Sequence, residues 1–206
     1  MKKLIALLLA VLMLAGTAFA EDAAVKTAVK TQTVESVSGL LTFEVPSRWY
    51  VMKPGTVDEL FTVAGDAAFD EMGLTEADIA NAKAAISQVD LSQMDMVYTA
   101  SMTGNLNVIA QEAAGMNMSL LKLMKSVYDQ MFAGQYMNMG VPEESIIYYD
   151  IEQIGDLEWY RMDVEYAGNE ICQFITCDQN SHMIIFTFTR ISEPDFMPVL
   201  ESVKLI

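Results

Sequence analysis

The feature that most constrains the fold is a series of short segments in which apolar and polar residues alternate. A period of two is typical of a β-strand with one buried face. Residues 183–189 are apolar on both faces, which favours a place in the centre of a sheet. The predicted strands are 39–46, 49–52, 94–100, 106–110, 146–154, 158–166, 171–177 and 183–189. Turn residues between neighbouring runs predict hairpins, and therefore a mainly antiparallel sheet.

The alternation also predicts which side chains face the core. In the strand at 158–166 the apolar set faces inward and the charged set faces solvent. In the strand at 146–154 one face carries Ile147, Tyr149 and Ile151. For 158–166 the inward set is Tyr160, Met162, Val164 and Tyr166, and the outward set is Arg161, Asp163 and Glu165.

Between and after these strands the apolar spacing becomes helical. Helices are predicted at about 57–72, 76–89 and 119–135, and a short one begins at Pro194. In the third helix Ser119 is the expected N-cap. Its expected apolar side consists of Leu120, Leu123, Met124, Val127, Tyr128, Met131 and Phe132. The pattern predicts an α+β protein in which helices cover an antiparallel sheet.

The N-terminal residues have the layout of a secretory signal peptide. Lys2 and Lys3 precede an apolar run, and a small-residue cleavage site ends at Ala20. Thr17 stands where a lipobox has its acylated cysteine, so we expect no lipid anchor by this route. We expect a signal peptide at 1–20, a flexible lead-in at 21–37 and one domain at 38–206, located outside the cytoplasm.

The amino-acid composition disfavours some classes of partner and limits the role of the cysteines. The formal net charge is −16, and the repulsion it implies disfavours nucleic acid and anionic membranes. Cys172 and Cys177 are the only cysteines. Five residues apart in one strand, they point to opposite faces and lie too far apart for a disulfide, so we expect free thiols.

Five segments in order resemble the PsbP-like family, which includes the PsbP subunit of photosystem II and the Mog proteins. They are Phe43-x-Val45-Pro46-x-x-Trp49, Leu106-Asn107-Val108, the strand with Tyr160, the strand 184–189, and Phe196-x-x-Val199-Leu200-x-Ser202-Val203-Lys204. The resemblance covers about residues 38–206 and implies an α/β/α sandwich without catalytic machinery. It carries over no metal-site residue and implies a binding or assembly role.

Catalytic motifs are absent from the sequence. His182 is the only histidine, and it follows a run of turn residues, so a turn position is expected rather than a catalytic one. Three Met-x-Met triplets could bind Cu(I) through soft thioether ligands, but filling of the core or of a binding surface is the favoured explanation. The candidate ligands are Met94, Met96, Met116, Met118, Met137 and Met139.

These observations favour an exported, non-enzymatic binding or accessory protein of the bacterial cell envelope. We expect no cofactor, and a protein or small-ligand partner of unknown identity. Two alternatives remain open from the sequence: a methionine-based Cu(I) or Ag(I) binding protein, and a hydrolase that uses acidic residues.

Overall fold

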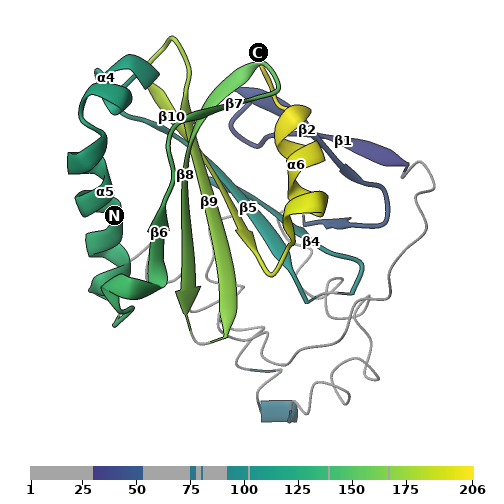
Figure 1. The fold of residues 1–206 in the computed structure, drawn as a ribbon. Helices are drawn as coiled ribbons and strands as arrows, with labels where there is room; N and C mark the ends of the chain where they lie inside the picture. The colour runs from purple at the N-terminus through teal and green to yellow at the C-terminus, as the bar shows by residue number, and fades with distance from the viewer. Residues whose placement is uncertain are drawn as a thin grey trace.

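A large antiparallel sheet forms the centre of the computed structural model, which describes residues 30–52, 75–77, 80, 92–101, 103–138, 140–166 and 168–206. The strand order is β3-β4-β5-β10-β9-β8-β6, and β7 also pairs with β8 (Figure 1). The strands of this sheet are β3 (Tyr50–Val51), β4 (Met94–Tyr98), β5 (Asn105–Glu112), β6 (Ile146–Tyr148), β7 (Glu152–Ile154), β8 (Leu157–Tyr166), β9 (Asn169–Cys177) and β10 (His182–Thr189).

The central place predicted for the last long strand is confirmed. β10 pairs with β5 on one side and β9 on the other, antiparallel in both cases. Ile184, Phe186 and Phe188 face one side of the sheet and are fully buried. The alternate positions Thr187 and Thr189 are also buried, on the opposite side. Burial on both faces explains why this strand lacks a polar face.

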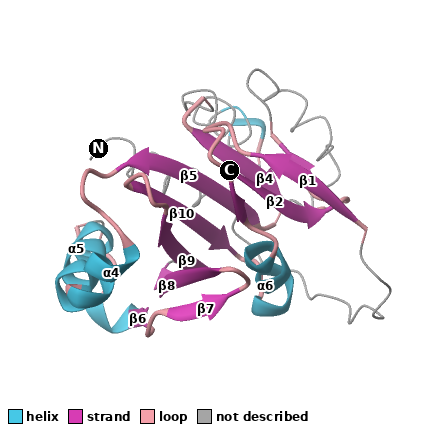
Figure 2. Cartoon of the chain, turned by 90° about the horizontal axis from the view of Figure 1, so that it is seen from above, coloured by secondary structure: helices cyan, strands magenta, loops and turns pink. Residues whose placement is uncertain are grey.

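Each face of the sheet is covered by helix, which confirms the α+β class (Figure 2). On one face α4 (Met118–Leu123) and α5 (Lys125–Met137) form a core with β6, β8 and β9. On the other face α6 (Glu193–Glu201) packs with Phe174, Phe186 and Phe188. The short 3-10 turn η1 (Glu143–Ser145) precedes β6.

A second, three-stranded sheet shares the face of α6. Its order is β1-β2-β11, with β1 (Thr31–Glu35), β2 (Leu41–Pro46) and β11 (Lys204–Leu205). The expectation of a flexible lead-in at 21–37 is therefore wrong for residues 31–35, because Val34 enters the core and the whole of β1 pairs with β2. Residues 21–29 and the expected leader at 1–20 lie outside the described residues.

The helix expected at 119–135 is two helices that meet at Met124. Asn117, and not Ser119, is the N-cap, and its side chain accepts a hydrogen bond from the Leu120 amide at 2.9 Å. The expected buried face is wrong in part. Phe132 is buried and Tyr128 packs against the core, as expected, whereas Leu123, Met124, Val127 and Met131 are exposed. The side chains that enter the core are Leu121, Phe132, Ala133 and Tyr136.

Other expectations are changed or lie outside the described residues. The strand expected at 146–154 is interrupted at 149–151, and its Ile147 is exposed while Ile146 is buried. Nearly all of the helices expected at 57–72 and 76–89 falls outside the described residues, although positions 76, 77 and 80 are helical.

Candidate functional site

A cavity of about 270 Å³ lies between the start of α6 and the strands β6, β8 and β9. The strands supply most of its charged side chains, and α6 with the loop before it supplies an apolar wall. The lining residues are Ile147, Arg161, Asp163, Val164, Glu165, Glu170, Ile171, Cys172, Ile191, Ser192, Glu193 and Phe196.

Alternation along β8 positions the charged residues of this cavity. Arg161, Asp163 and Glu165 lie on the side of the sheet that α6 covers, opposite to the core of α4 and α5. The sequence predicted that this face is open to solvent, and that prediction is wrong for two of them. The side chain of Arg161 is only 11% exposed and that of Asp163 only 17%.

The Arg161 guanidinium lines the cavity and is held by its neighbours. Its Nε donates to Asp163 Oδ1 at 3.0 Å, and its Nη2 donates to Asp163 Oδ2 at 2.7 Å. Its Cζ atom lies 4.3 Å from the centre of the Tyr149 ring, 5.4 Å from that of Phe174 and 5.6 Å from that of Phe196. The hydrogen bonds with Asp163 raise the pKa of Arg161 above its ordinary value. Arg161 is the only positively charged lining residue, and the Asp163 carboxylate already balances most of its charge.

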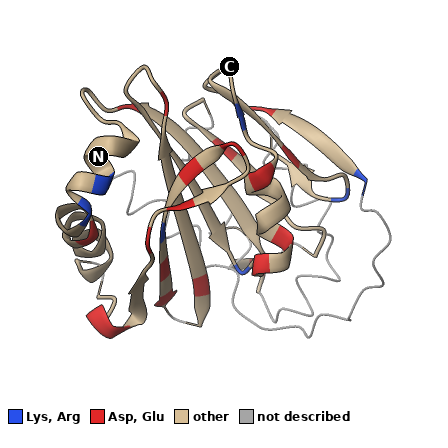
Figure 3. Cartoon of the chain, turned by 45° about the horizontal axis from the view of Figure 1, so that its top comes forward, with Lys and Arg blue, Asp and Glu red and all other residues tan. Residues whose placement is uncertain are grey.

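The cavity nevertheless carries an excess of negative charge. Besides Asp163 it is lined by Glu165, Glu170 and Glu193, and Glu193 lies 3.6 Å from Arg161 Nη1. Glu165 stands directly opposite Glu170 in the β8–β9 ladder. Like charges at directly paired positions repel each other and destabilise a sheet. Figure 3 shows further acidic residues on α6 and on the strands beside it.

The two cysteines are free, as predicted from their spacing. Burial, together with the charge of Asp163, raises the pKa of Cys172 to about 12. Burial also raises the pKa of Cys177 to about 11. Both thiols are therefore protonated at neutral pH, and a thiol lacks the nucleophilicity of a thiolate.

His182 is the first residue of β10, directly after the turn that follows β9. Asp178 Oδ1 accepts hydrogen bonds from the amides of Asn180 and His182, and its Oδ2 lies 2.7 Å from His182 Nδ1. Burial acts to raise the pKa of Asp178, but the hydrogen bonds from His182 and Asn180 outweigh it, and the pKa lies below its ordinary value. The pair closes the hairpin.

The methionine candidates lie on three different elements. The β4 pair is buried on one side of its strand, as expected for core residues. The pair at α4 packs against the core of α4 and α5, whereas the methionine at the end of α5 is exposed. The positions are Met94 and Met96 in β4, Met116 and Met118 at the start of α4, Met137 at the end of α5, and Met139 outside the described residues.

Two searches limited to the described residues were negative. They contain no group of three or more His, Cys, Asp or Glu side chains that could hold a metal ion. They also contain no helix long and apolar enough to cross a membrane. The four carboxylates that line the cavity therefore do not form such a group.

No family model and no curated protein matches the chain. The structure is similar to the solution structure of cyanobacterial PsbP from Synechocystis sp. PCC 6803, with 12% identity and a TM-score of 0.49 over 90% of this chain and 98% of that chain. This relative is a PsbP protein, the type that the sequence motifs resemble.

A crystal structure from Bacteroides thetaiotaomicron is similar over 84% of this chain, with 12% identity and a TM-score of 0.43. The chain spans about half the length of that protein, 48%. These similarities concern architecture, and the function proposed below rests on the cavity.

Sequence reasoning did not single out Arg161 as a site residue. The available signal was an arginine on the polar side of a long strand in a chain whose last helix has its own apolar face. A helix of that kind buries its apolar face against a sheet. The charged side of β8 can therefore be covered by that helix and need not face solvent.

Proposed function

We propose that the chain is an extracytoplasmic, non-enzymatic binding protein whose cavity beside α6 takes a basic side chain of a partner. The observation that carries the proposal is the opposed pair Glu165 and Glu170 at a cavity whose one arginine is already paired with Asp163. A cation placed between the two glutamates would relieve their repulsion.

The shape and chemistry of the wall favour lysine or arginine over a metal ion. Dispersed carboxylates suit a large organic cation, because a small divalent ion needs several oxygens at about 2.0–2.6 Å. Ile147, Ile191 and Phe196 supply apolar surface against which the methylene stem of a long basic side chain can lie.

The state of the nucleophilic groups supports binding rather than catalysis. The Cys172 thiol that lines the cavity is protonated at neutral pH, and the His182 ring at the start of β10 is paired with Asp178. Neither group offers the activated nucleophile and base that covalent catalysis requires.

Export is the part of the proposal that rests on sequence alone. The basic residues, apolar run and cleavage site of residues 1–20 support it. A mass spectrum of the protein collected from outside the cytoplasm should give a mature N-terminus at Glu21. An intact leader or a different N-terminus would contradict this cleavage.

The binding proposal is tested by titrating the protein with a penta-lysine peptide and following the backbone amide resonances of β8, β9 and α6. We expect saturable shifts for residues that line the cavity, and none with penta-glutamine. The double variant Glu165→Gln/Glu170→Gln should weaken penta-lysine binding by about tenfold, because two carboxylates near a cation are lost.

The matched control is Glu35→Gln/Glu112→Gln, which removes the same charge from exposed positions on β1 and β5. It should weaken binding by less than about twofold at physiological salt, where distant charges are screened. Equal losses in the two double variants would show general attraction to an acidic protein and would overturn the assignment to the cavity.

A further inference from the structure

The strand β6 is an edge of the large sheet and lies beside the cavity. It is the last strand in the order, and within the described part of the chain it pairs only with β8. Figure 2 shows β6 and β7 at the outer end of the sheet. Ile147 on β6 is 54% exposed and is also one of the residues that line the cavity. A molecule that docks on this edge therefore lies next to the cavity.

The register of β6 shows which of its backbone groups point away from the sheet. The Tyr149 amide donates to the Arg161 carbonyl at 3.2 Å. In an antiparallel ladder, residues that bond to the partner strand alternate with residues whose N–H and C=O face outward. Ile147 therefore bonds to β8, as Tyr149 does, whereas Ile146 and Tyr148 present their backbone groups at the edge.

Three of these outward groups can bond to a further strand. The Ile146 amide is already used, because it donates to the Glu143 carbonyl of η1. The Ile146 carbonyl and both backbone groups of Tyr148 remain, and no turn or loop hydrogen bond of the described residues uses them. An extended segment laid antiparallel along β6 would bond to all three, which is the geometry of β-strand addition.

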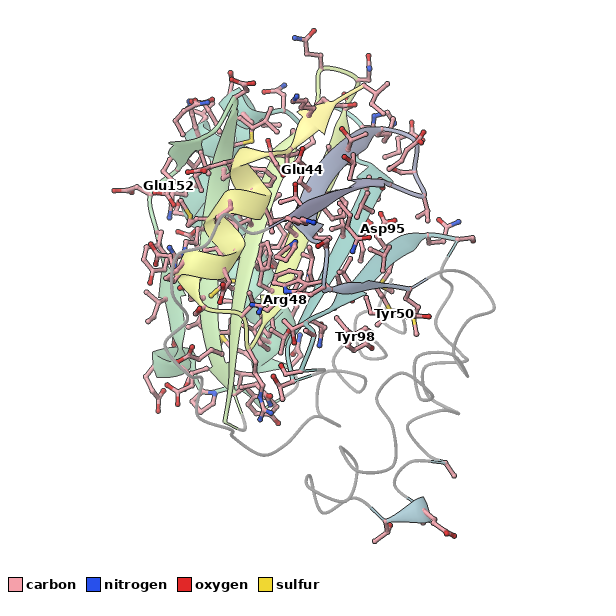
Figure 4. All side chains as sticks on the ribbon, turned by 90° about the vertical axis from the view of Figure 1, so that its right-hand side faces the viewer. Glu44, Arg48, Tyr50, Asp95, Tyr98 and Glu152 are labelled. Atoms are coloured by element: carbon pink, nitrogen blue, oxygen red, sulfur yellow. The ribbon has the colours of Figure 1, made fainter. Side chains whose placement is uncertain are left out.

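Negative charge surrounds this edge. Glu143 and Glu144 precede β6, Asp150 and Glu152 follow it, and all four are exposed. Figure 4 shows Glu152 at the outer margin of the molecule. Residues 126–160 contain no Lys or Arg. Two copies of this edge would repel each other, so the charge favours a basic segment of another protein over a second copy of the chain.

We propose that an extended, basic segment of a partner protein adds to β6 as an antiparallel strand and places its basic side chains over the cavity. This inference rests on the proposed function, because it states how the partner presents the basic side chain. Ile147 and Asp163 are directly opposite in the ladder and both line the cavity. A partner residue opposite Ile147 would share that face, and so would every second residue from it.

The row of residues that contains the two cavity glutamates extends toward this edge. Glu165 is directly opposite Glu170, and continuing the register of β6 with β8 by one residue places Ser145 beside Glu165. A strand added to β6 lies two strand spacings from β8, about 9.6 Å. A long basic side chain and a glutamate side chain together span that distance, and the methylene stem of the basic side chain can lie over the small Ser145.

The test titrates the full chain with a capped hexapeptide, Lys-Thr-Lys-Val-Lys-Thr, and follows the backbone amide resonances. With the lysine side chains on the cavity face, the amides of the residues between them point at β6. Methylation of the backbone nitrogens of the second and fourth residues should weaken binding at least about tenfold, because two hydrogen bonds are lost. The matched control carries the methyl groups on the third and fifth residues, and it should bind within about threefold of the unmodified peptide.

Amide hydrogen exchange gives a second readout. Saturation with the unmodified peptide should slow exchange of the Tyr148 amide at least about fivefold, because that amide gains a partner. Exchange of the Tyr149 amide, which is already bonded to the Arg161 carbonyl, should change less than about twofold. Equal slowing of the two amides would contradict strand addition.

The outcomes separate this inference from the proposed function. Equal binding of the two methylated peptides, with binding still weakened by Glu165→Gln/Glu170→Gln, would overturn strand addition and leave the proposed function in place. The reverse methylation pattern would overturn the antiparallel register. Binding that depends on methylation but is unchanged by Glu165→Gln/Glu170→Gln would overturn the placement of basic side chains over the cavity. Failure of the unmodified peptide to bind would overturn both proposals.

Discussion

At the scale of single residues, Arg161 carries the positive charge of the cavity lining and is paired with Asp163. Its guanidinium is largely enclosed between Tyr149, Phe174 and Phe196, where solvent compensates its charge poorly. The two-pronged contact with Asp163 supplies that compensation. The pair therefore matters for the stability of the fold as well as for the charge of the cavity.

We expect Asp163→Asn to lower the free energy of unfolding by about 2 kcal/mol. The amide keeps the shape but removes the negative charge, so Arg161 retains only Glu193 at 3.6 Å. Urea denaturation measures the loss. Asp156→Asn, at an exposed turn position, should change stability by less than about 0.5 kcal/mol. Similar losses in both variants would argue against a paired, enclosed arginine.

The thiols give a second residue-scale prediction. With the pKa of Cys172 at about 12 and that of Cys177 at about 11, alkylation by iodoacetamide should be slow at pH 8. The rate should rise about tenfold for each pH unit up to about pH 10, since only the thiolate reacts.

Single-cysteine variants separate the two sites. Cys177→Ser leaves Cys172, which should react more slowly than the Cys177 that remains in Cys172→Ser. A rate that levels off near pH 9 in the folded protein, as in an unfolded control, would contradict the raised pKa values.

At the scale of elements, the pair α4 and α5 shows how burial overrides local pattern. Leu121 is fully buried, whereas the adjacent Leu123 is 83% exposed. Asn117 caps α4, and the helix is interrupted at Met124, which is both the C-cap of α4 and the N-cap of α5. Of the apolar side predicted along 119–135, Tyr128 and Phe132 contact the core, whereas Leu123, Met124, Val127 and Met131 are exposed.

The two leucines provide a matched test of this arrangement. Leu121→Ala should cost about 3 kcal/mol, because it leaves a cavity in the core of α4 and α5. Leu123→Ala should cost less than about 0.5 kcal/mol, because its side chain is already in water. Chemical denaturation measures the free energy of unfolding of both variants. A larger loss for Leu123→Ala than for Leu121→Ala would support the buried face predicted from the sequence.

The strands could be predicted from the sequence, whereas the buried face of α4 and α5 could be predicted only in part. The alternation in 94–98, 158–166 and 183–189 indicates strands directly, since a strand's side chains reach the core at fixed intervals of two. The sequence could not show that α6 and β2 lie over the charged side of β8 and the neighbouring strands. That contact joins segments far apart in the chain, so the enclosed Arg161 and its cavity could not be predicted.

At the scale of the whole molecule, Asp95 links the two sheets. Ser36 Oγ donates to Asp95 Oδ2 at 2.7 Å, and the Val37 amide donates to Asp95 Oδ1 at 3.1 Å. These contacts tie the turn between β1 and β2 to β4. Burial raises the pKa of Asp95, and the hydrogen bonds from Ser36 and Val37 lower it only in part.

The link predicts a pH dependence. Because the pKa of Asp95 is higher in the folded state than in the unfolded chain, its contribution to stability is greatest below the ordinary aspartate pKa and falls as pH rises through the raised value. Asp95→Asn lacks this titration. Its stability relative to the parent protein should therefore increase with pH above about 4, measured by urea denaturation.

Ser36→Ala sharpens that test. It removes a hydrogen bond that lowers the pKa of Asp95, so the pKa should rise further. The Ser36→Ala variant should therefore lose more stability with rising pH than the parent protein does. A parent protein that gains stability relative to Asp95→Asn as pH rises would contradict the sign of the shift.

The pairing of β2 with β11 has a consequence for the time the chain needs to fold. Thr42 pairs with Lys204 and Leu41 with Leu205, so the small sheet closes across almost the whole described chain. Closing so long a loop is entropically costly, and proteins dominated by such distant pairings fold in milliseconds to seconds rather than microseconds. We therefore expect the pairing of β11 with β2 to form late in folding, after the hairpin β1–β2.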